Sequence, residues 1–272
     1  MFIHNINPIL IPISESFAIR YYGLIYALAF ILVYFLFKRF AAKGSIKNLK
    51  PELVDSLTLY VVLGVIIGAR LGEVLFYNLP YYLSKPLHIF MVWQGGMSFH
   101  GGLIGVAIVL YLFCKKHKIN LLEIADILVI PAAFALFLGR IANFINHELI
   151  GVPTKNTPWY CIDYSNYGIE GCRHPSQIYE SIKNLFIGLI LLIEYNYFQK
   201  FKKKYKPGIV FFSFITLYGL LRFLVNFYRA DHPIIISLGI STGQILSLLM
   251  FFVGIFFLIK NYLLKKDDKK VK

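Results

Sequence analysis

Long apolar runs separated by short polar connections dominate the pattern of hydrophobic and polar positions along the chain. A run of about 18 or more apolar residues can cross the roughly 30 Å of hydrocarbon in a bilayer as a helix. Runs that approach or exceed this length lie near residues 22–38, 57–78, 99–114, 124–142, 178–198, 208–228 and 235–259. The pattern therefore predicts an all-α, polytopic integral membrane protein with seven transmembrane helices, which form a single domain over residues 1–272.

The composition agrees with this class of protein. Hydrophobic residues make up 58% of the chain and charged residues 15%, whereas a soluble globular domain carries about 25% charged residues. The longest connection, about residues 143–177, contains several prolines and glycines. A loop of that length is more often functional than a plain linker, so we expect it to cover a site.

Basic residues are concentrated in alternate connections. Nineteen Lys and Arg fall within residues 38–50, 115–118, 200–206 and 260–272, whereas five lie in the intervening connections. Because loops rich in Lys and Arg stay on the cytoplasmic side, we expect a cytoplasmic C-terminus and an N-terminus outside. The net charge of +14 is then a topology signal, and no nucleic-acid partner is expected.

Two of the three cysteines flank part of the external connection. Cys161 and Cys172 would lie in an oxidising compartment, which permits disulfides, so they are a candidate disulfide. Cys114 lies at the cytoplasmic end of a predicted span and is expected to be a buried apolar residue.

Ionisable residues within predicted spans are candidate site residues, because an unpaired charge is costly in hydrocarbon. Arg70 precedes Glu73 by three residues, close enough on a helix for an ion pair. That pair would either hold two helices together or take part in binding. Glu180 and Lys183 are expected to reach the outer surface, and Lys183 is assigned no function.

Glycines cluster in two neighbouring predicted spans. Gly64 and Gly68 in "GVIIGARLG" have the small-xxx-small spacing that lets helices pack closely. "MSFHGGLIG" places His100 among glycines, which allow a backbone to approach a ligand. An imidazole can accept a proton near neutral pH, so His100 is either a structural residue or a general base.

The stretch "GRIANFINHELIG" (139–151) concentrates polar groups where the fourth span meets the external surface. Arg140 and Asn143 share one helical face, and a planar guanidinium suits a phosphate or carboxylate. The polar and turn residues that follow are Asn146, His147, Glu148 and Gly151. A helix end facing water would explain His147 but not the deeper arginine, so the stretch favours a lipid-headgroup site.

A third polar constellation lies in the sixth predicted span. At spacings of four, four and three, one helical stripe carries Tyr218, Arg222, Asn226 and Arg229. Two arginines on one stripe repel unless an anion or a carboxylate lies between them. The stripe therefore binds an anion together with Arg140, or it pairs with Asp126 and Glu148 for structure alone.

The sequence closely resembles the bacterial prolipoprotein diacylglyceryl transferase family over nearly its whole length, and its motifs stand in the order found in that family. The stretches that carry the resemblance are "RYYGLIY" (20–26), "HGGLIG" (100–105), "GRIANFINHELIG" (139–151), "RHPSQIYE" (173–180) and "YGLLRFLVNFYR" (218–229). The "GRxxNFxNxExxG" pattern is highly specific, and "RHPSQIYE" is weak when read on spacing alone.

The resemblance implies a transferase of the bacterial inner membrane with its active site toward the periplasm. It would move the diacylglyceryl group of phosphatidylglycerol to the lipobox cysteine thiol of a preprolipoprotein, releasing glycerol phosphate. Displacing a phosphate ester needs stabilisation of the leaving charge, and the nucleophile must be a thiolate. No metal or organic cofactor is expected, and we expect a monomer.

The resemblance, together with the polar positions described above, gives two overlapping sets of expected site residues. Those tied to the reaction are Tyr22, His100, Arg140, Asn143, Glu148 and Arg222. Those expected to bind the lipid substrate are Arg70, Arg140, Asn143, Gly151, Tyr218, Arg222 and Arg229.

Within these sets, His100 would be the base, and Arg140 and Arg222 would hold the phosphate. Asn143 and Tyr22 would orient the glycerol. An arginine bound to the phosphate could instead lower the pKa of the substrate thiol without any base.

Two further positions follow from the motif. Glu148 would position an arginine or assist the base, and Gly151 would allow a tight turn. Asn226 stands where the family often has a glutamate, and an asparagine cannot form the same ion pair.

Two other classes of function remain open from the sequence. A lipid or solute transporter would also line a membrane cavity with arginines, although transporters commonly show internal repeats, which this chain lacks. A membrane-embedded binding or assembly factor for secreted proteins would need no chemistry at all. Thioether formation from phosphatidylglycerol and a lipobox peptide separates the enzyme from both.

Overall fold

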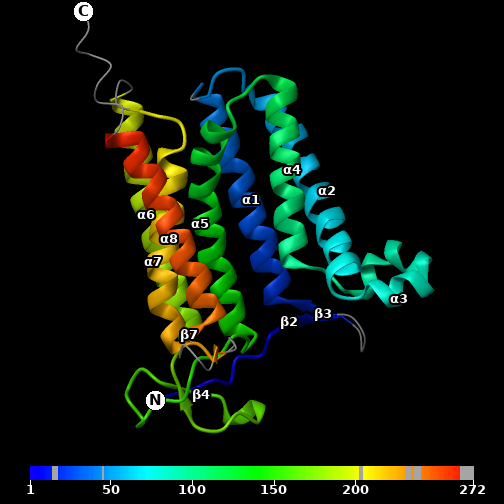
Figure 1. The fold of residues 1–272 in the computed structure, drawn as a ribbon. Coiled ribbons are helices and arrows are strands. Elements are labelled where there is room, and N and C mark those ends of the chain that lie inside the picture. Colours follow the sequence, from blue (N-terminus) through cyan, green and yellow to red (C-terminus); the bar gives the residue numbers. More distant parts are fainter. Residues whose placement is uncertain (14–17, 45, 202–204, 231–233, 236–239, 264–272) are drawn as a thin grey trace, which may run out of the picture. The chain divides into compact units, whose positions relative to one another are not determined.

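The computed structural model describes residues 1–13, 18–44, 46–201, 205–230, 234–235 and 240–263. Its long helices, drawn in Figure 1, are α1 (Tyr21–Ala42), α2 (Pro51–Phe76), α4 (Phe99–His117), α5 (Leu121–Ile145), α6 (Ser176–Lys200), α7 (Ile209–Val225) and α8 (Thr242–Leu263). Each overlaps one predicted span. The basic residues at 202–204 and 265–272, and residues 236–239 of the last predicted span, lie outside the described residues.

Six helices of the described chain are long and apolar enough to cross a membrane. They are α1, α2, α5, α6, α7 extended through the 3₁₀ turn η5 (Asn226–Tyr228), and α8. The 19-residue α4 is not among them. The prediction of an all-helical, multi-pass membrane protein is therefore confirmed.

The chain forms two compact units, one comprising Met1–Phe35 and Ala125–Lys272 (unit 1) and the other Leu36–Ile124 (unit 2). In unit 2, α2 and α4 pack in antiparallel fashion through their glycines. A Cβ on Gly101 would overlap the carbonyl oxygen of Gly68, and a Cβ on Gly68 would lie 2.9 Å from the Cα of Gly105. The small-residue spacing predicted for helix packing serves this contact.

The connection between α2 and α4 contains three short helical pieces. They are α3 (Leu79–Ser84) and the 3₁₀ helices η1 (Pro86–Phe90) and η2 (Val92–Gln94). The Ser98 side chain then caps α4 by accepting a hydrogen bond from the Gly101 amide at 3.2 Å, as expected for a serine N-cap.

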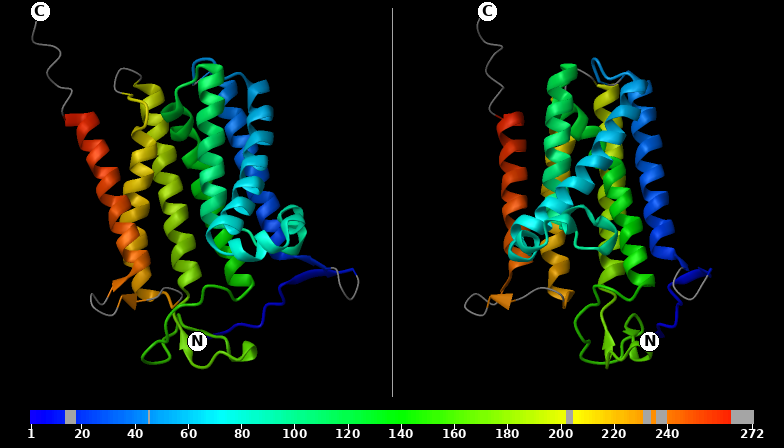
Figure 2. Two further views of the ribbon diagram at one scale, coloured as in Figure 1. Left: turned by 45° about the vertical axis from the view of Figure 1, so that its right-hand side comes forward. Right: turned by 90° about the vertical axis from the view of Figure 1, so that its right-hand side faces the viewer.

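In unit 1, α7 and α8 run side by side in both views of Figure 2. The start of α7 is fixed by Asp126 of α5, which is fully buried. Its carboxylate accepts hydrogen bonds from the amides of Gly208 and Phe211, both at 2.7 Å, and from the Tyr205 hydroxyl at 2.8 Å. Asp126 therefore caps a helix. The alternative in which Asp126 pairs with the arginine stripe is therefore not found in the described structure.

The connection between α5 and α6 is an ordered part of unit 1. Its strands β4 (Ile162–Asp163) and β5 (Cys172–Arg173) pair antiparallel, and β1 (Phe2–Ile3) adds in parallel to β4. Cys161 and Cys172 form a disulfide with a Cα–Cα distance of 5.6 Å. These contacts fasten the first residues of the chain to the loop.

Two small antiparallel hairpins complete the strands of unit 1. β2 (Ile9–Pro12) pairs with β3 (Ala18–Arg20) just before α1, and β6 (Ile234–Ile235) pairs with β7 (Ile240–Ser241) just before α8.

Candidate functional site

A single buried carboxylate contacts four cationic side chains of unit 1. Glu180, in the second turn of α6, is 0% exposed. Its Oε2 lies 3.7 Å from Arg140 Nε and accepts a hydrogen bond from Lys183 Nζ at 3.0 Å. Its Oε1 pairs with Arg222 and lies 4.0 Å from Arg229. We call Glu180 and these four cations the Glu180 cluster.

The start of α6 places Glu180 beside the segment that follows α5. The Ser176 hydroxyl donates to the Leu149 carbonyl at 2.8 Å, and the Gln177 amide donates to the Glu148 carbonyl at 2.6 Å. The motifs "RHPSQIYE" and "GRIANFINHELIG" are therefore docked on each other, which sequence spacing alone did not indicate.

A short hydrogen-bonded chain extends outward from Arg140. Its guanidinium donates to Asn143 Oδ1 at 3.3 Å, and the Asn143 amide donates to Glu148 at 2.8 Å. Glu148 also accepts from Asn146 at 3.2 Å. Glu148 thus acts on Arg140 through Asn143, and the expected direct pairing of Glu148 with the arginine stripe is not found among the described ion pairs.

His147 belongs to the connection between α5 and α6 and not to this chain of polar groups. Its ring stacks on Tyr167 at 3.7 Å between centroids, and its φ of 48° is left-handed. This position agrees with the prediction that His147 ends the helix.

The arginine stripe of the sixth span continues past the end of α7. The α-helix ends at Val225, η5 follows, and Arg229 has extended backbone with φ −103° and ψ 140°. The prediction of one continuous α-helical stripe is wrong beyond Val225. Arg229 nevertheless reaches Glu180, because Gly151 forms an isolated bridge with it.

Gly151 is required for space and not for a turn. A Cβ there would overlap the carbonyl oxygen of His174 and lie 2.7 Å from that of Tyr228. Val152 donates to the same Tyr228 carbonyl at 3.1 Å. The glycine therefore lets the segment after α5 pack against the end of η5, and its expected role in a tight turn is corrected accordingly.

Two tyrosines border the cluster. The Lys183 ammonium lies 3.9 Å from the centroid of the Tyr218 ring, within the range of a cation–π contact. Tyr22 donates to the Tyr26 hydroxyl at 3.3 Å and lies within electrostatic reach of Arg140 and Glu148.

Asn226 is buried near the end of α7. Within the described chain, neither its amide nitrogen nor its amide oxygen has a hydrogen-bond partner. A buried polar group without a partner is unusual and calls for a ligand or water.

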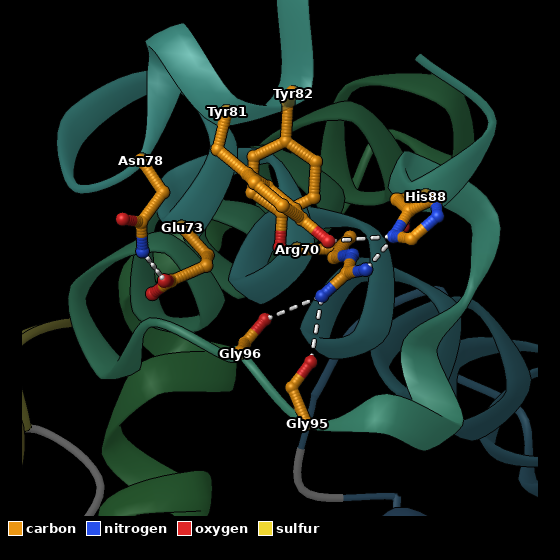
Figure 3. Close-up of a pocket in the computed structure, with 8 residues that line it drawn as sticks. All are labelled: Arg70, Glu73, Asn78, Tyr81, Tyr82, His88, Gly95 and Gly96. Atoms are coloured by element: carbon orange, nitrogen blue, oxygen red, sulfur yellow. Dashed lines mark hydrogen bonds between the residues drawn. The ribbon is translucent and has the colours of Figure 1, made fainter. Parts of the chain in front are cut away.

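Arg70 lies in unit 2 and is used differently (Figure 3). Its Nε and Nη1 donate to the carbonyls of Ile89 at 2.9 Å, Gly95 at 2.6 Å and Gly96 at 3.0 Å. Its Nη2 donates to the carbonyl of His88 and, at 3.1 Å, to that of Met91. A guanidinium has five N–H donors, so the backbone occupies all of them.

The predicted ion pair of Arg70 with Glu73 is wrong. In the described structure Glu73 instead accepts a hydrogen bond from the Asn78 amide at 2.6 Å. Helical spacing permits the pair, but both residues form hydrogen bonds with the connection after α2 instead: Arg70 with its carbonyls and Glu73 with Asn78.

His100 is the second residue of α4 in unit 2, and its side chain is exposed. Two of the glycines before it, Gly95 and Gly96, line a pocket with Arg70 (Figure 3). Gly101 and Gly105 make the close contact with α2 described above, so the glycine density that favoured a base at His100 has a packing explanation.

Glu180 and Lys183 are the site residues that sequence reasoning missed. Both are buried, so their predicted position at the outer surface is wrong. The available signal was a carboxylate inside a predicted span, which by itself indicates a site.

The geometry defines a class of site. Among the described residues, four cations meet this one buried carboxylate, and an anion would add a second counter-charge. Arg140 and Arg222 keep 16% and 13% of their side chains exposed, so they can contact that anion. The chain is thus a multi-pass membrane protein with a cluster of four cationic side chains around one buried carboxylate.

Comparison with known proteins narrows this class. The family model for prolipoprotein diacylglyceryl transferase matches residues 8–260. Proteins named phosphatidylglycerol–prolipoprotein diacylglyceryl transferase from Geobacter sulfurreducens and Rickettsia canadensis are 40% and 41% identical over 256 and 258 residues. The matches cover 92% and 93% of this chain and 94% and 96% of those relatives. The chain belongs to the prolipoprotein diacylglyceryl transferase family.

A relative from Rhodospirillum rubrum with the same name is 39% identical, covering 92% of this chain and 90% of its own. The three names agree on a transferase, so the comparisons give no support to a transporter.

Proposed function

We propose that the protein is a transferase that moves the diacylglyceryl group of phosphatidylglycerol to the lipobox cysteine of preprolipoproteins, in lipoprotein biosynthesis. The observation that carries this proposal is the Glu180 cluster in a chain of this family. Arg140 and Arg222 approach Glu180 from α5 and α7, and their partly exposed guanidiniums suit the headgroup phosphate.

The chemistry matches an excess of positive charge. A sulfur–carbon bond forms at the glycerol carbon of the diacylglyceryl group while the carbon–oxygen bond to phosphate breaks. The leaving glycerol phosphate gains a negative charge, which preorganised guanidiniums stabilise more strongly in the transition state than in the bound lipid. The thiol proton must pass to a base.

The site residues divide into groups by their contacts. Arg140 and Arg222 hold the phosphate, and Glu180 keeps both guanidiniums in place. Asn143 and Tyr22 orient the glycerol.

The remaining positions of unit 1 act through these groups. Glu148 holds Asn143, Gly151 brings Arg229 to the cluster, and Tyr218 packs under the Lys183 ammonium. Arg70, expected to bind lipid, acts instead by ordering the connection after α2.

His100 is the proposed base. The supporting observations are its exposed side chain and the ordinary affinity of imidazole for a proton near neutral pH. If His100 takes the proton, replacing it with Gln should suppress turnover and remove the pH dependence of the rate, while lipid binding persists. If the wild-type rate did not change with pH, His100 would not be the base. The arginine bound to the phosphate would then lower the pKa of the substrate thiol by itself.

The proposed topology has seven spans, which are the six candidate membrane helices and, in addition, α4. It places the N-terminus in the periplasm and the C-terminus in the cytoplasm of an inner-membrane protein, with the active site toward the periplasm. The support is the distribution of Lys and Arg among the connections. Both units would form a single transferase domain, active as a monomer and without a cofactor.

Purified protein, phosphatidylglycerol with a labelled acyl chain and a lipobox peptide test the reaction directly. We expect labelled thioether product and glycerol phosphate in equal amounts. Labelled lipid bound or moved between leaflets without thioether formation would favour a transporter, and peptide binding alone would favour an assembly factor. Either result with folded protein rejects the transferase.

A further inference from the structure

The connection between α2 and α4, residues 77–98, is held at one end of a packed helix pair. Gly64 and Gly68 of α2 meet Gly105 and Gly101 of α4 in reverse order, so the two helices are antiparallel. The end of α2 and the start of α4 therefore lie on the same side. Because α2 can cross a membrane, this connection must lie at a bilayer surface.

This connection exposes an unusual number of large apolar side chains. Those at least 70% exposed, together with the last residue of α2, are Phe76, Leu83, Leu87, Phe90 and Trp93. Side chains this exposed add nothing to the core of unit 2. Aromatic and aliphatic residues are typical of the boundary between headgroups and acyl chains, whereas in water such a surface favours association.

Arg70 gives the connection a fixed shape. Arg70 donates to five main-chain carbonyls between His88 and Gly96, two of them in η1 and the others just outside the 3₁₀ turns. Its guanidinium also lies 5.0 Å from the centroid of the buried Tyr82 ring. Figure 3 shows the guanidinium beneath the rings of Tyr81 and Tyr82, with the carbonyls of Gly95 and Gly96 directed at it.

The occupant that this surface fits is lipid. The last turns of α2 expose Leu71 and Leu75, which on a membrane-crossing helix face acyl chains. The apolar surface of residues 76–93 continues directly from these side chains at the depth where the helix leaves the hydrocarbon.

We propose that residues 77–98 form an interfacial segment that inserts its apolar side chains into the headgroup boundary, with Arg70 as the residue that organises it. The segment would set the depth of α2 and α4 in the bilayer. This inference does not depend on the transferase reaction.

Tryptophan fluorescence tests the proposal. The chain has two tryptophans, so Trp159→Phe leaves Trp93 as the only reporter in the full-length protein. The protein is reconstituted in vesicles of phosphatidylcholine and phosphatidylglycerol that carry bromine either near the headgroup or near the chain end. We expect shallow bromines to quench Trp93 more than deep ones, and aqueous iodide to quench it weakly.

A calibrator and an Arg70 variant sharpen the result. Ile67→Trp, in protein lacking both native tryptophans, places a reporter about 13 Å deeper along α2, where deep bromines should quench more. Arg70→Gln should make Trp93 accessible to iodide while the reporter at 67 keeps its deep signature, which shows that α2 remains inserted.

Three outcomes would overturn the proposal. Trp93 quenched by iodide and not by brominated lipid would place the segment in water. A deep signature like that at 67 would place it in the hydrocarbon. An unchanged Trp93 signature in Arg70→Gln would remove Arg70 as the organising residue.

Discussion

Arg70 in unit 2 and Arg140 and Arg222 in unit 1 all lie on helices long and apolar enough to cross a membrane, yet their donors are used in different ways. Arg70 is buried, and main-chain carbonyls occupy all five of its N–H groups. Arg140 and Arg222 meet on one carboxylate and keep part of their guanidiniums exposed. The first arrangement completes a local structure, and the second keeps charged groups where a ligand could reach them.

The difference shows what makes an intramembrane arginine part of a site. Charge alone does not, because a guanidinium whose donors are all occupied cannot bind phosphate in a bidentate manner. The informative quantity is the balance between donors, acceptors and charge around it. In the Glu180 cluster cations outnumber carboxylates, whereas around Arg70 the neutral carbonyls match the donors one to one.

Removing the shared carboxylate should have the largest effect. Glu180→Gln leaves the cations of the cluster without a counter-charge in a buried place, and breaking a buried ion pair costs about 3–5 kcal/mol. We expect a clear fall in Tm in detergent and loss of nearly all thioether formation. Differential scanning fluorimetry and the labelled-lipid assay measure the two effects.

Glu194→Gln is the matched control on the same helix. Glu194 accepts a hydrogen bond from Ser213 at 2.9 Å and has no arginine partner among the described ion pairs. If Glu194→Gln and Glu180→Gln were equally stable and equally active, the Glu180 cluster would not organise the site.

Arginine-to-lysine substitutions should separate the two settings. A lysine cannot reproduce a bidentate contact, and removing one donor to developing charge costs about 10²–10³ in rate, so Arg140→Lys should lose that much activity with little change in Tm. Arg70→Lys leaves buried carbonyls unpaired, at about 1–3 kcal/mol each, so its main effect should be on Tm. If Arg140→Lys mainly lowered Tm and Arg70→Lys mainly lowered the rate, the roles assigned to the two arginines would be wrong.

The fold was largely predictable from the sequence because membrane helices are encoded locally. Each long helix overlaps one apolar run, and the ends are set by capping groups that hydropathy does not record. Asp126 starts α7 near Gly208, although Asp126 lies on α5 and is remote in sequence. That contact also explains why the alternative of an arginine partner for Asp126 is not found.

The site was only partly predictable, because its centre depends on contacts between distant segments. The motifs around Arg140 and Arg222 were recognisable, since each concentrates polar residues in an apolar context. Glu180 was hidden in an apolar run near a helix start, where a position at the outer surface was equally compatible with spacing. Only the docking of α6 on the segment after α5 identifies its partners.

The close packing at Gly151 gives a smaller expected effect. Gly151→Ala must push apart two carbonyls that a Cβ would touch, and overpacking of this kind costs about 1–3 kcal/mol. Arg229 should then move away from Glu180, lowering Tm and the rate together. Gly139→Ala is the control, because its Cβ would meet only the Tyr26 hydroxyl at an ordinary 3.5 Å. Equal Tm and rate for both variants would show that the backbone yields at Gly151.

The smallest expected effect concerns His4, whose neutral imidazole helps to hold the first residues of the chain against the connection between α5 and α6. His4 is fully buried, and its Nε2 lies 2.9 Å from the Phe144 carbonyl oxygen. Burial lowers the pKa of His4 below 6.5; the nearby His147 lowers it further, and the Phe144 hydrogen bond offsets part of this. Because the unfolded chain then binds the proton more readily, this stability is fully present above pH 6.5 and is lost as the pH falls below it. We expect Tm to fall by a few degrees on acidification, and less in His4→Gln, whose side chain does not titrate. If the two proteins had the same pH profile of Tm, the contact of the first strand with the loop would not depend on His4. That result would not bear on the Glu180 cluster.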